Sequence, residues 1–526
     1  MSSIVLITPT PPDISAFGVR SLSAVLRQAG HRTRIVFLPG SAGMLHESGD
    51  FVYRYSAKAM NALTDLCSGF DYIGISFMTY YLDRAVQITE VLKKKYDIPI
   101  IWGGIHTTCK PEEALIYADM ACVGEGETAL TALLNGNSDI PGIWTKQRNE
   151  IIRTGIAPLV EDLNTLPFFD FSNENHFIYT PENQLIEPLT DDRLAHVLPR
   201  LPYFHGDLLK SFRIMTDRGC PHSCHYCNVP VIKRIYEKTK TSYFRNRSVS
   251  HVIEELEWIC DRYPFIEAIQ FFDDTFFSRK TEWLEEFSDA YRNRVRLPFY
   301  CQASPTTLTQ TKLDILMKAG MVYVEMGIQT GSSKIRSIYN RKETSRQIMD
   351  SAMMIHRKIP QLLPPDYHVI IDSPWEDSAD LLDTVKLLLE IPKPFGLAIS
   401  SLIFFPETEL YHRAIADGFI HDELKEIARK PFYVAPQKSY PHFLLYLMTF
   451  QHIPKSIFKI LMNDRILRFF ERNQLSPLFR LAYIAGEGCR LIQKGVTALI
   501  QGDIKRIFNY FSKLRIKDTV VAGRKA

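Results

Sequence analysis

Three cysteines lie close together near the middle of the chain, Cys220, Cys224 and Cys227. Their C-x3-C-x2-C spacing places three thiolate ligands in one short loop without an evident fourth ligand. Three thiolates can bind three irons of a four-iron cluster and leave the fourth iron open to a substrate, so the loop is a candidate for chemistry. Two alternatives stay open on the spacing alone. One is a structural zinc site completed by His222 or His225, and the other is a pair of disulfides in an oxidising compartment.

The loop lies at the start of a region in which strand and helix patterns alternate six times. Six βα units predict an incomplete barrel over residues 211–415, and the active residues of barrels lie at the C-terminal ends of the strands. The cysteine loop follows the first strand, as that rule requires. The predicted strands are residues 213–217, 268–272, 299–303, 323–326, 367–371 and 397–404.

Strand and helix patterns also alternate over residues 1–140, which predicts an α/β domain with a doubly wound, Rossmann-like parallel sheet. Ligands of such sheets bind at the carboxyl ends of the strands. The unusual residues of this region lie at those predicted ends, and several are glycines that permit close backbone approach or a tight turn. They are Thr8, Pro9, Ser76, Thr79, Gly103, Gly104, His106, Gly124, Glu125 and Gly126.

The cysteine loop resembles the signature of the radical S-adenosylmethionine (SAM) enzymes, including the aromatic Tyr226 before the third cysteine. The resemblance implies that the three cysteines hold a [4Fe-4S] cluster, and that SAM binds the open iron and is cleaved to a 5′-deoxyadenosyl radical. It also implies that Tyr226 of the loop and residues at other strand ends contact SAM, with Gly327 allowing close backbone approach. These are Tyr226, Asp273, Asp274, Gln302, Glu325, Gly327 and Gln329. For a single acid among them, a helix cap or a solvated loop charge is the alternative.

Upstream of such a loop, the strings Gly-Gly-x-His and Val-Gly-Glu-Gly-Glu resemble the cobalamin-binding domain of cobalamin-dependent radical SAM enzymes. The resemblance implies that the strand-end residues of the first domain contact cobalamin. The chain has no Asp-x-His-x-x-Gly string, so cobalamin should lack a histidine lower ligand of that type. His106 is either a polar loop residue or a contact to the corrin or its tail.

The remaining segments differ in composition. Residues 141–210 are rich in turn-forming residues, and we expect an ordered linker without catalytic residues. Residues 416–526 should form a mostly helical, basic C-terminal domain. Between residues 451 and 526, fifteen Lys or Arg stand against five Asp or Glu, interleaved with apolar residues at helical spacing. Such helices either cap the barrel or lie on an anionic membrane surface.

Composition limits the class of protein. The 526 residues are 46% hydrophobic and 23% charged with a net charge of +3, which predicts a globular protein and argues against a nucleic-acid binder. The other cysteines are scattered and lie mostly in apolar segments, as in a reduced, cytoplasmic protein. The N-terminus lacks a signal-peptide pattern, and no 18-residue apolar run predicts a membrane span. We therefore expect a cytoplasmic protein that either stays in solution or associates with a membrane surface.

Taken with the resemblance, these features favour methylation of an unactivated carbon of a lipid-like or secondary metabolite. A cobalamin-assisted oxidative cyclisation or rearrangement without methyl transfer is the alternative. A cobalamin-carrying regulator with a structural cluster is a third reading, and replacing Cys224 with Ala would leave its function intact. The enzyme readings require a small-molecule substrate and a reductant such as flavodoxin or ferredoxin.

Overall fold

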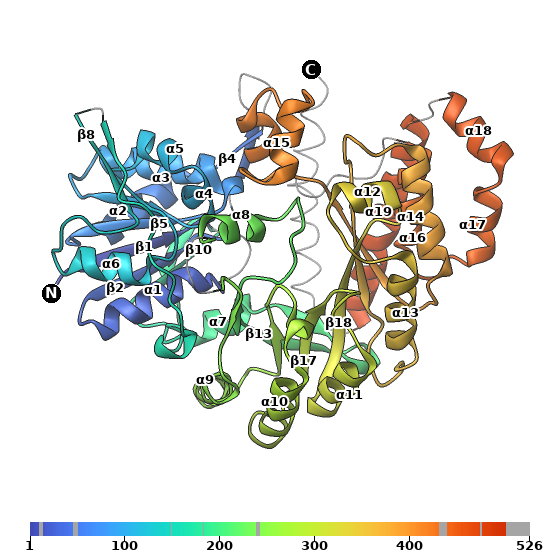
Figure 1. Ribbon diagram of the computed structural model, residues 1–526, viewed down its shortest axis with the longest axis horizontal. Helices are drawn as coiled ribbons and strands as arrows, with labels where there is room; N and C mark the ends of the chain where they lie inside the picture. Colours follow the sequence, from blue (N-terminus) through green and yellow to red (C-terminus); the bar gives the residue numbers. More distant parts are fainter. Residues whose placement is uncertain are drawn as a thin grey trace.

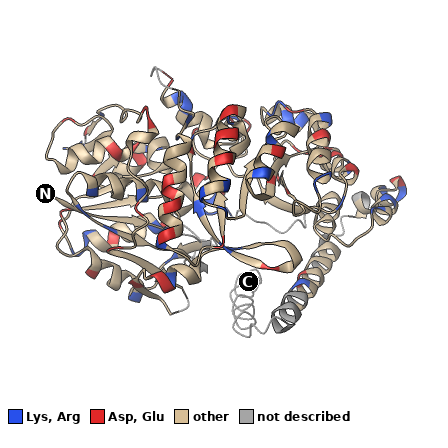
Figure 2. Cartoon of the chain, turned by 90° about the horizontal axis from the view of Figure 1, so that it is seen from below, with Lys and Arg blue, Asp and Glu red and all other residues tan. Residues whose placement is uncertain are grey.

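Figure 1 shows the computed structural model, which describes residues 1–9, 14–40, 42–45, 51–148, 150–181, 183–237, 242–430, 439–473 and 476–500. A first α/β unit, blue to cyan, lies beside a second one in green and yellow, and helices in red follow. Lys and Arg, blue in Figure 2, and Asp and Glu, red, are both spread over the molecule, in keeping with the small net charge. The predicted order of a doubly wound domain, an open barrel and a helical region is confirmed.

The first sheet has nine strands with a parallel centre. The central strands, in the spatial order β2-β1-β5-β6-β7, are β1 (Ser3–Thr8), β2 (Arg32–Phe37), β5 (Tyr72–Ser76), β6 (Ile100–Gly103) and β7 (Met120–Cys122). Every residue of β1 is buried, as expected for a strand covered on both faces. The order reverses between β1 and β5, and ligands of such sheets bind at that reversal.

Helices connect these strands. They are α1 (Phe17–Gln28), α2 (Ala57–Cys67), α3 (Leu82–Lys93), α4 (Ile105–Cys109), α5 (Pro111–Tyr117) and α6 (Gly126–Leu134). A separate antiparallel hairpin consists of β3 (Ala42–Leu45) and β4 (Phe51–Arg54). The helices are amphipathic, and their apolar residues pack on the sheet, which leaves the strand ends to the loops.

The segment 141–210, expected as a linker, contains regular structure. β8 (Ile143–Gln147) and β9 (Glu150–Ile152) extend one edge of the first sheet, and β10 (His176–Thr180) and β11 (Leu185–Pro188) extend the other. These strands are short and flanked by Asn, Asp and Pro, so their turn residues dominate the sequence pattern. Most of the segment therefore belongs to the first sheet, and α7 (Asp191–Val197) leads out of it.

The second sheet begins with β12 (Arg200–Pro202), which pairs antiparallel with the first of six parallel strands. In spatial order these six are β13 (Leu208–Ile214), β16 (Ala268–Phe271), β17 (Phe299–Ala303), β18 (Met321–Gln329), β19 (Asp366–Ile371) and β20 (Gly396–Ser401). The helices around it are α8 (Asn228–Ile235), α9 (Val249–Arg262), α10 (Thr281–Arg294), α11 (Gln310–Ala319), α12 (Ser333–Ile338), α13 (Ser345–His356) and α14 (Ser378–Glu390). This is the predicted partial (β/α)6 barrel.

The first barrel strand lies earlier than predicted, because residues 215–217 leave the sheet. The backbone N–H groups of Thr216 and Asp217 donate to the Asp273 carboxylate at 2.6 and 3.0 Å. The chain continues into β14 (Asp217–Arg218), which pairs with β15 (Arg245–Asn246) in a two-stranded ribbon. This ribbon leads directly to the cysteine loop.

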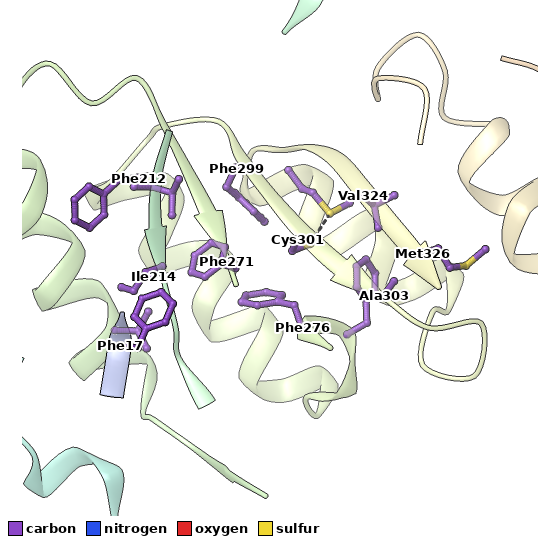
Figure 3. Packing of buried hydrophobic residues seen from close by; sticks show 14 of the residues in the cluster. Phe17, Phe212, Ile214, Phe271, Phe276, Phe299, Cys301, Ala303, Val324 and Met326 are labelled. Carbon is purple, nitrogen blue, oxygen red and sulfur yellow. Dashed lines mark hydrogen bonds between the residues drawn. The ribbon is translucent and has the colours of Figure 1, made fainter. Parts of the chain in front are cut away.

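One continuous apolar core joins the two sheets. Figure 3 shows Phe271 of β16 and Phe299 of β17 among the buried residues of the barrel, with Phe17 of α1 beside Ile214. The ring of Phe17 also lies 6.4 Å from the ring of Phe272, centroid to centroid. Because a residue of the first domain enters the core of the second, apolar packing fixes the two domains against each other.

After β20 the chain returns to the first domain. α15 (Glu409–Ala416), orange in Figure 1, lies against the blue part of the molecule. Lys110 Nζ donates to the Tyr411 hydroxyl at 2.8 Å, and the Arg429 guanidinium pairs with both oxygens of Asp83 at 2.9 and 3.0 Å. Residues 402–430 thus connect the far end of the barrel with the start of the chain.

The C-terminal region is helical, as expected, over the residues that the structure describes. It consists of α16 (Tyr440–Met448), α17 (Lys455–Leu461), α18 (Asp464–Asn473) and α19 (Ser476–Ile500). α16 packs on α14, α18 and α19. The apolar and basic stretch at 507–516 lies outside the described residues.

Candidate functional site

The cysteine loop runs between β14 and α8. Cys227 is the N-cap residue of α8, and its sulfur accepts a hydrogen bond from the backbone N–H of Val229 at 3.5 Å. Gly219 has a φ of +91°, and a Cβ there would lie 2.9 Å from the backbone oxygen of Tyr243. A glycine is therefore required directly before the first cysteine, because a side chain would both strain the backbone and clash.

The three thiols form a donor set that fits a cluster of several irons. Burial raises the pKa of the Cys220 and Cys227 thiols to about 12, and the three thiols are near enough to influence one another. In the described part of the chain, no three His, Cys, Asp or Glu side chains lie close enough together to bind one metal ion. Thiolates that bind three different irons lie farther apart than the ligands of one ion, and iron binding would release their protons.

The end of α12 fixes the loop from one side. The His225 N–H donates to the Tyr339 carbonyl at 3.0 Å, and the Asn340 amide donates to the Ser223 carbonyl at 2.8 Å. The rings of Tyr226 and Tyr339 pack edge to face at 5.2 Å. Tyr226 therefore contributes to the packing that holds the cysteines in place.

Asp273 and Asp274 have different environments, although they are neighbours in the sequence. The Asp273 carboxylate is 0% exposed and accepts the three hydrogen bonds of Thr216 and Asp217. Arg279 Nη2 lies 3.2 Å from it. Asp274 is exposed toward the cavity described below, and burial followed by the charge of Asp273 raises its pKa to about 6. The first carboxylate holds the strand ends together, while the second is free to meet a ligand.

Four more predicted residues lie together on β17 and β18. Gln302 Nε2 donates to Glu325 Oε2 at 3.4 Å, and His368 Nε2 lies 3.7 Å from the same oxygen. Gln329 has a φ of +68°, which is unusual for a residue with a side chain and typical of functional strand ends. A Cβ at Gly327 would lie 2.5 Å from the Gln329 amide. None of the four lines the cavity between the domains.

A cavity of about 350 Å³ lies between the two domains, at the carboxyl ends of their strands. Of the residues predicted from the sequence, six line it: Ser76, Gly104, Gly124, Glu125, Gly126 and Asp274. On the barrel side the wall includes Met215, Asp217, Arg218 and Gly219, directly before the first cysteine. The cavity therefore lies next to both proposed cofactor regions.

Two glycines of this wall are required by the fold, and a third borders open space. Gly104 has a φ of +88°, and a Cβ there would lie 2.7 Å from the Phe77 carbonyl. Gly124 has a φ of +98°, and a Cβ there would collide with the Tyr236 hydroxyl. At Gly18, in contrast, a Cβ would meet no atom within 4 Å, so space remains above α1. The open space at Gly18 lies near the switch point of the sheet, which is where a ligand such as cobalamin would bind.

The other predicted residues of the first domain lie behind this wall. Thr8 and Pro9 are buried at the end of β1, and Gly103 ends β6. His106 Nδ1 lies 3.2 Å from Thr79 Oγ1, and its ring stacks on Phe77 at 5.1 Å. Burial lowers the pKa of His106 to about 4, so the ring is neutral at pH 7. It is 1% exposed and does not reach the cavity.

Sequence reasoning missed the cationic partners of the glutamates. Arg218 Nη1 lies 3.1 Å from Glu125 Oε1, and Arg218 Nη2 lies 2.5 Å from Glu127 Oε1. Arg245 Nη2 lies 2.5 Å from Glu125 Oε1. Glu125 therefore faces two guanidinium groups of the barrel. Arg218 stands two residues before Cys220, but nothing in the sequence shows that its partner comes from another domain.

Two family models match this chain. The radical SAM superfamily matches residues 214–388, and the B12 binding domain matches residues 4–134. An uncharacterized methyltransferase of Pyrococcus horikoshii is 22% identical over 364 residues, which are 66% of this chain and 70% of that protein. The cobalamin-dependent radical SAM methyltransferase TokK of Streptomyces tokunonensis is 23% identical over 265 residues, which are 45% of this chain and 35% of that one.

Solved structures show the same fold. Apo OxsB, a cobalamin-dependent SAM radical enzyme, superposes with a TM-score of 0.64 at 13% identity and covers 98% of this chain and 83% of its own. The radical SAM methyltransferase TsrM from Kitasatospora setae, with cobalamin and a [4Fe-4S] cluster bound, has a TM-score of 0.56 at 16% identity. That likeness covers 79% of this chain and 75% of TsrM. The arrangement of a first sheet followed by an open barrel is thus a known architecture.

Proposed function

The chain is a member of the cobalamin-dependent radical SAM enzymes, and from that premise we propose that it methylates an unactivated carbon of a small lipid-like or secondary metabolite. When bound, the cluster with SAM supplies a carbon-centred radical, and cobalamin supplies a methyl group. The observation that carries the proposal is the cavity, because its wall comes from both domains and lies beside the cysteine loop. Two reagents that must act on one carbon need this proximity.

The overall reaction balances without a further oxidant. One substrate C–H and two SAM, with two electrons, give one C–CH3, S-adenosylhomocysteine, 5′-deoxyadenosine and methionine. A C–H bond breaks and a C–C bond forms, and one sulfonium loses its methyl group while the other loses its adenosyl group. Both electrons come from a reductant, for which we propose a flavodoxin or a ferredoxin.

The residues of the chain have separate roles in this proposal. Cys220, Cys224 and Cys227 hold the cluster. The small cavity-wall residues of the first domain, Ser76, Gly104, Gly124 and Gly126, contact cobalamin. Asp274 and the Gln302–Glu325 pair offer acceptors and donors to the SAM ammonium and ribose groups. The apolar part of the cavity wall, which includes Phe17, Leu22 and Phe169, excludes water from the reacting carbon.

Membrane contact would fit a lipid-like substrate. Of the seventeen large apolar residues that are exposed in the described chain, seven lie between residues 457 and 492. They are Ile457, Ile460, Phe469, Leu478, Leu481, Ile484 and Ile492. Exposed basic residues lie between them, including Lys459, Arg465 and Arg468. We propose that α17 to α19 lie on an anionic lipid surface. None of the described helices is both long and apolar enough to span a bilayer.

The test is product analysis with methyl-deuterated SAM, using the anaerobic, cofactor-loaded enzyme with lipid extracts as substrate. Methylation predicts S-adenosylhomocysteine, 5′-deoxyadenosine and a deuterated product together. 5′-Deoxyadenosine alone would favour the alternative, a radical cyclisation or rearrangement without methyl transfer. Cys224→Ala should remove cluster iron and 5′-deoxyadenosine, while Cys489→Ala, a change at an exposed cysteine of α19, should alter neither. A wild type that forms neither nucleoside product would contradict both activities.

A further inference from the structure

The border between the two domains contains buried charges next to the cysteine loop. Glu125 is the N-cap residue of α6 and Glu127 lies in its first turn, so both carboxylates belong to the first domain. Arg218 of β14 and Arg245 of β15 belong to the barrel. The side chains are between 5% and 18% exposed. We call these four residues the Glu–Arg cluster.

The contacts of the cluster are specific in geometry. Arg218 bridges the two carboxylates, at 3.1 Å to Glu125 and 2.5 Å to Glu127. Arg245 binds both oxygens of Glu125, at 2.5 and 3.1 Å, in the fork arrangement that suits a guanidinium and a carboxylate. Ser21 of α1 donates to Glu127 at 2.6 Å and accepts from Arg218 at 3.1 Å. Each charge of the cluster therefore has a partner across the domain border.

Removing one partner would leave a charge buried without compensation. Burial alone would raise the pKa of Glu127, but the Arg218 guanidinium holds it below its usual value. Glu127 is therefore ionised at neutral pH, and so is Arg218. A buried ion pair of this kind adds little net stability. It does fix the relative position of its partners, because any arrangement that leaves one of the charges unpaired is costly.

The Glu–Arg cluster also borders the cavity. Glu125, Glu127 and Arg218 all line it, and Arg218 pairs in register with Arg245 on the ribbon that ends two residues before Cys220. A shift of the first domain would move Glu125 and Glu127, and Arg218 would transmit that shift to the cysteine loop. This link is separate from the apolar contact of Phe17 with the barrel core.

We propose that the Glu–Arg cluster positions the cobalamin domain relative to the cysteine loop, so that radical formation is coupled to methyl transfer. The coupling rests on the proposed function, whereas the positioning does not. Glu125, Glu127, Arg218 and Arg245 are positioning residues, which act on the reaction through the distance between the two cofactor sites. Loss of the Glu–Arg cluster should leave the iron–sulfur cluster and cobalamin both bound, but the distance between them should vary.

The first experiment measures that separation in the cofactor-loaded enzyme. Pulsed EPR between reduced cluster and cob(II)alamin should give one narrow distance distribution in the wild type, and in Glu127→Gln a distribution at least about twofold broader. Glu257→Gln is the matched control, because it removes an ion pair of similar length, to Arg294 at 2.5 Å, within the barrel and away from the border. A Glu127→Gln distribution as narrow as that of the control would overturn the proposal.

The second readout is the ratio of 5′-deoxyadenosine to methylated product. Since small misplacements of reacting groups strongly reduce a reaction, we expect this ratio to rise about tenfold or more in Glu127→Gln. An unchanged ratio would overturn the coupling. The two readouts can also disagree. If the distance distribution broadens in Glu127→Gln but the wild type yields no methylated product, the proposed function is refuted and the positioning is supported. If Glu127→Gln does not fold, Arg218→Lys keeps the charge and can meet only one carboxylate, so the same two readouts apply to it.

Discussion

The guanidinium of Arg341 donates a hydrogen bond to the sulfur of Cys224, with 3.7 Å between Nη1 and Sγ. The same side chain donates to the Gly327 carbonyl at 3.0 Å and pairs with Glu343 at 2.5 Å. Arg341 thus ties the cysteine loop to the end of β18. A donor to a ligating sulfur stabilises the more negative, reduced state of an iron–sulfur cluster.

Replacing Arg341 with Gln should therefore lower the reduction potential of the cluster. A lost hydrogen bond of roughly 1–2 kcal/mol corresponds to about 40–90 mV for a one-electron couple. Spectroelectrochemical titration of the loaded protein measures this shift. Lys342→Gln, the same change at the exposed neighbour, should leave the potential where it is. A loaded Arg341→Gln protein with the wild-type potential would show that the residue only supports the loop.

Replacement by Asn should affect stability at Asp273 and SAM binding at Asp274. Asp273→Asn removes one of the two carboxylates that face buried Arg279, the other being that of Asp217, and should destabilise the protein by roughly 3 kcal/mol. Asp274→Asn should leave stability nearly unchanged and weaken SAM binding, because this side chain faces the cavity. Urea unfolding and SAM titration of both variants separate the two roles. Equal loss of stability in both would contradict the assignment.

Glu376 should make the free energy of unfolding fall as pH rises from about 5 to about 8. Burial, followed by the charges of Asp380 and Asp372, raises its pKa from 4.5 to about 8. Between these values the folded state binds the proton that the unfolded state has lost, so the free energy of unfolding decreases as pH rises through this window. The decrease should be on the order of 3 kcal/mol, less than the full shift because the side chain is partly solvated.

Glu376→Gln should lack this decrease, and comparison of the two proteins cancels the titration of all other groups. Urea unfolding at pH 5 and pH 8.5 measures the difference, with both pH values chosen from the two ends of the window. The variant should gain stability over the wild type at the higher pH. A stability difference that is the same at both pH values would show that Glu376 titrates normally.

Introducing a negative charge at apolar positions of the C-terminal helices tests the membrane contact. Ile460→Glu and Phe469→Glu place a charge at two of the exposed apolar positions, which are 64% and 54% exposed. Each should weaken co-sedimentation with phosphatidylglycerol vesicles about tenfold or more, because an apolar side chain of this size contributes about 1.5–3 kcal/mol when buried. Ile116→Glu in α5, a residue 69% exposed, is the matched control. Equal binding to neutral vesicles would contradict the electrostatic part of the proposal.

Local patterns were sufficient for the cysteine loop and for most barrel strands. The spacing of Cys220, Cys224 and Cys227 is a property of one short segment, and parallel strands with alternating helices leave a strong periodic signal. The five later barrel strands lie within a few residues of their predicted positions. The first strand ends earlier because Asp273, some sixty residues further along, accepts the N–H groups of Thr216 and Asp217.

Contacts between distant segments could not be predicted in this way. Glu125 looked like a ligand-binding residue because it stands between two glycines at a strand end, yet both of its cationic partners belong to the barrel. The strands at residues 143–188 pair with edges that only the folded sheet provides. A sequence pattern describes what each segment can form, whereas these partners depend on where the segments meet.

The return of residues 402–430 to the first domain joins the end of the barrel to a part of the chain that is made much earlier. Asp83 and Lys110 are synthesised early, but Arg429 and Tyr411, their partners, emerge only after more than three hundred further residues. During synthesis the first domain therefore lacks these two contacts, and a bulky cofactor that enters on that side meets neither of them. In the finished protein, entry from that side requires the Asp83–Arg429 and Lys110–Tyr411 contacts to break. Cobalamin present during translation should thus load faster than cobalamin added to the folded enzyme.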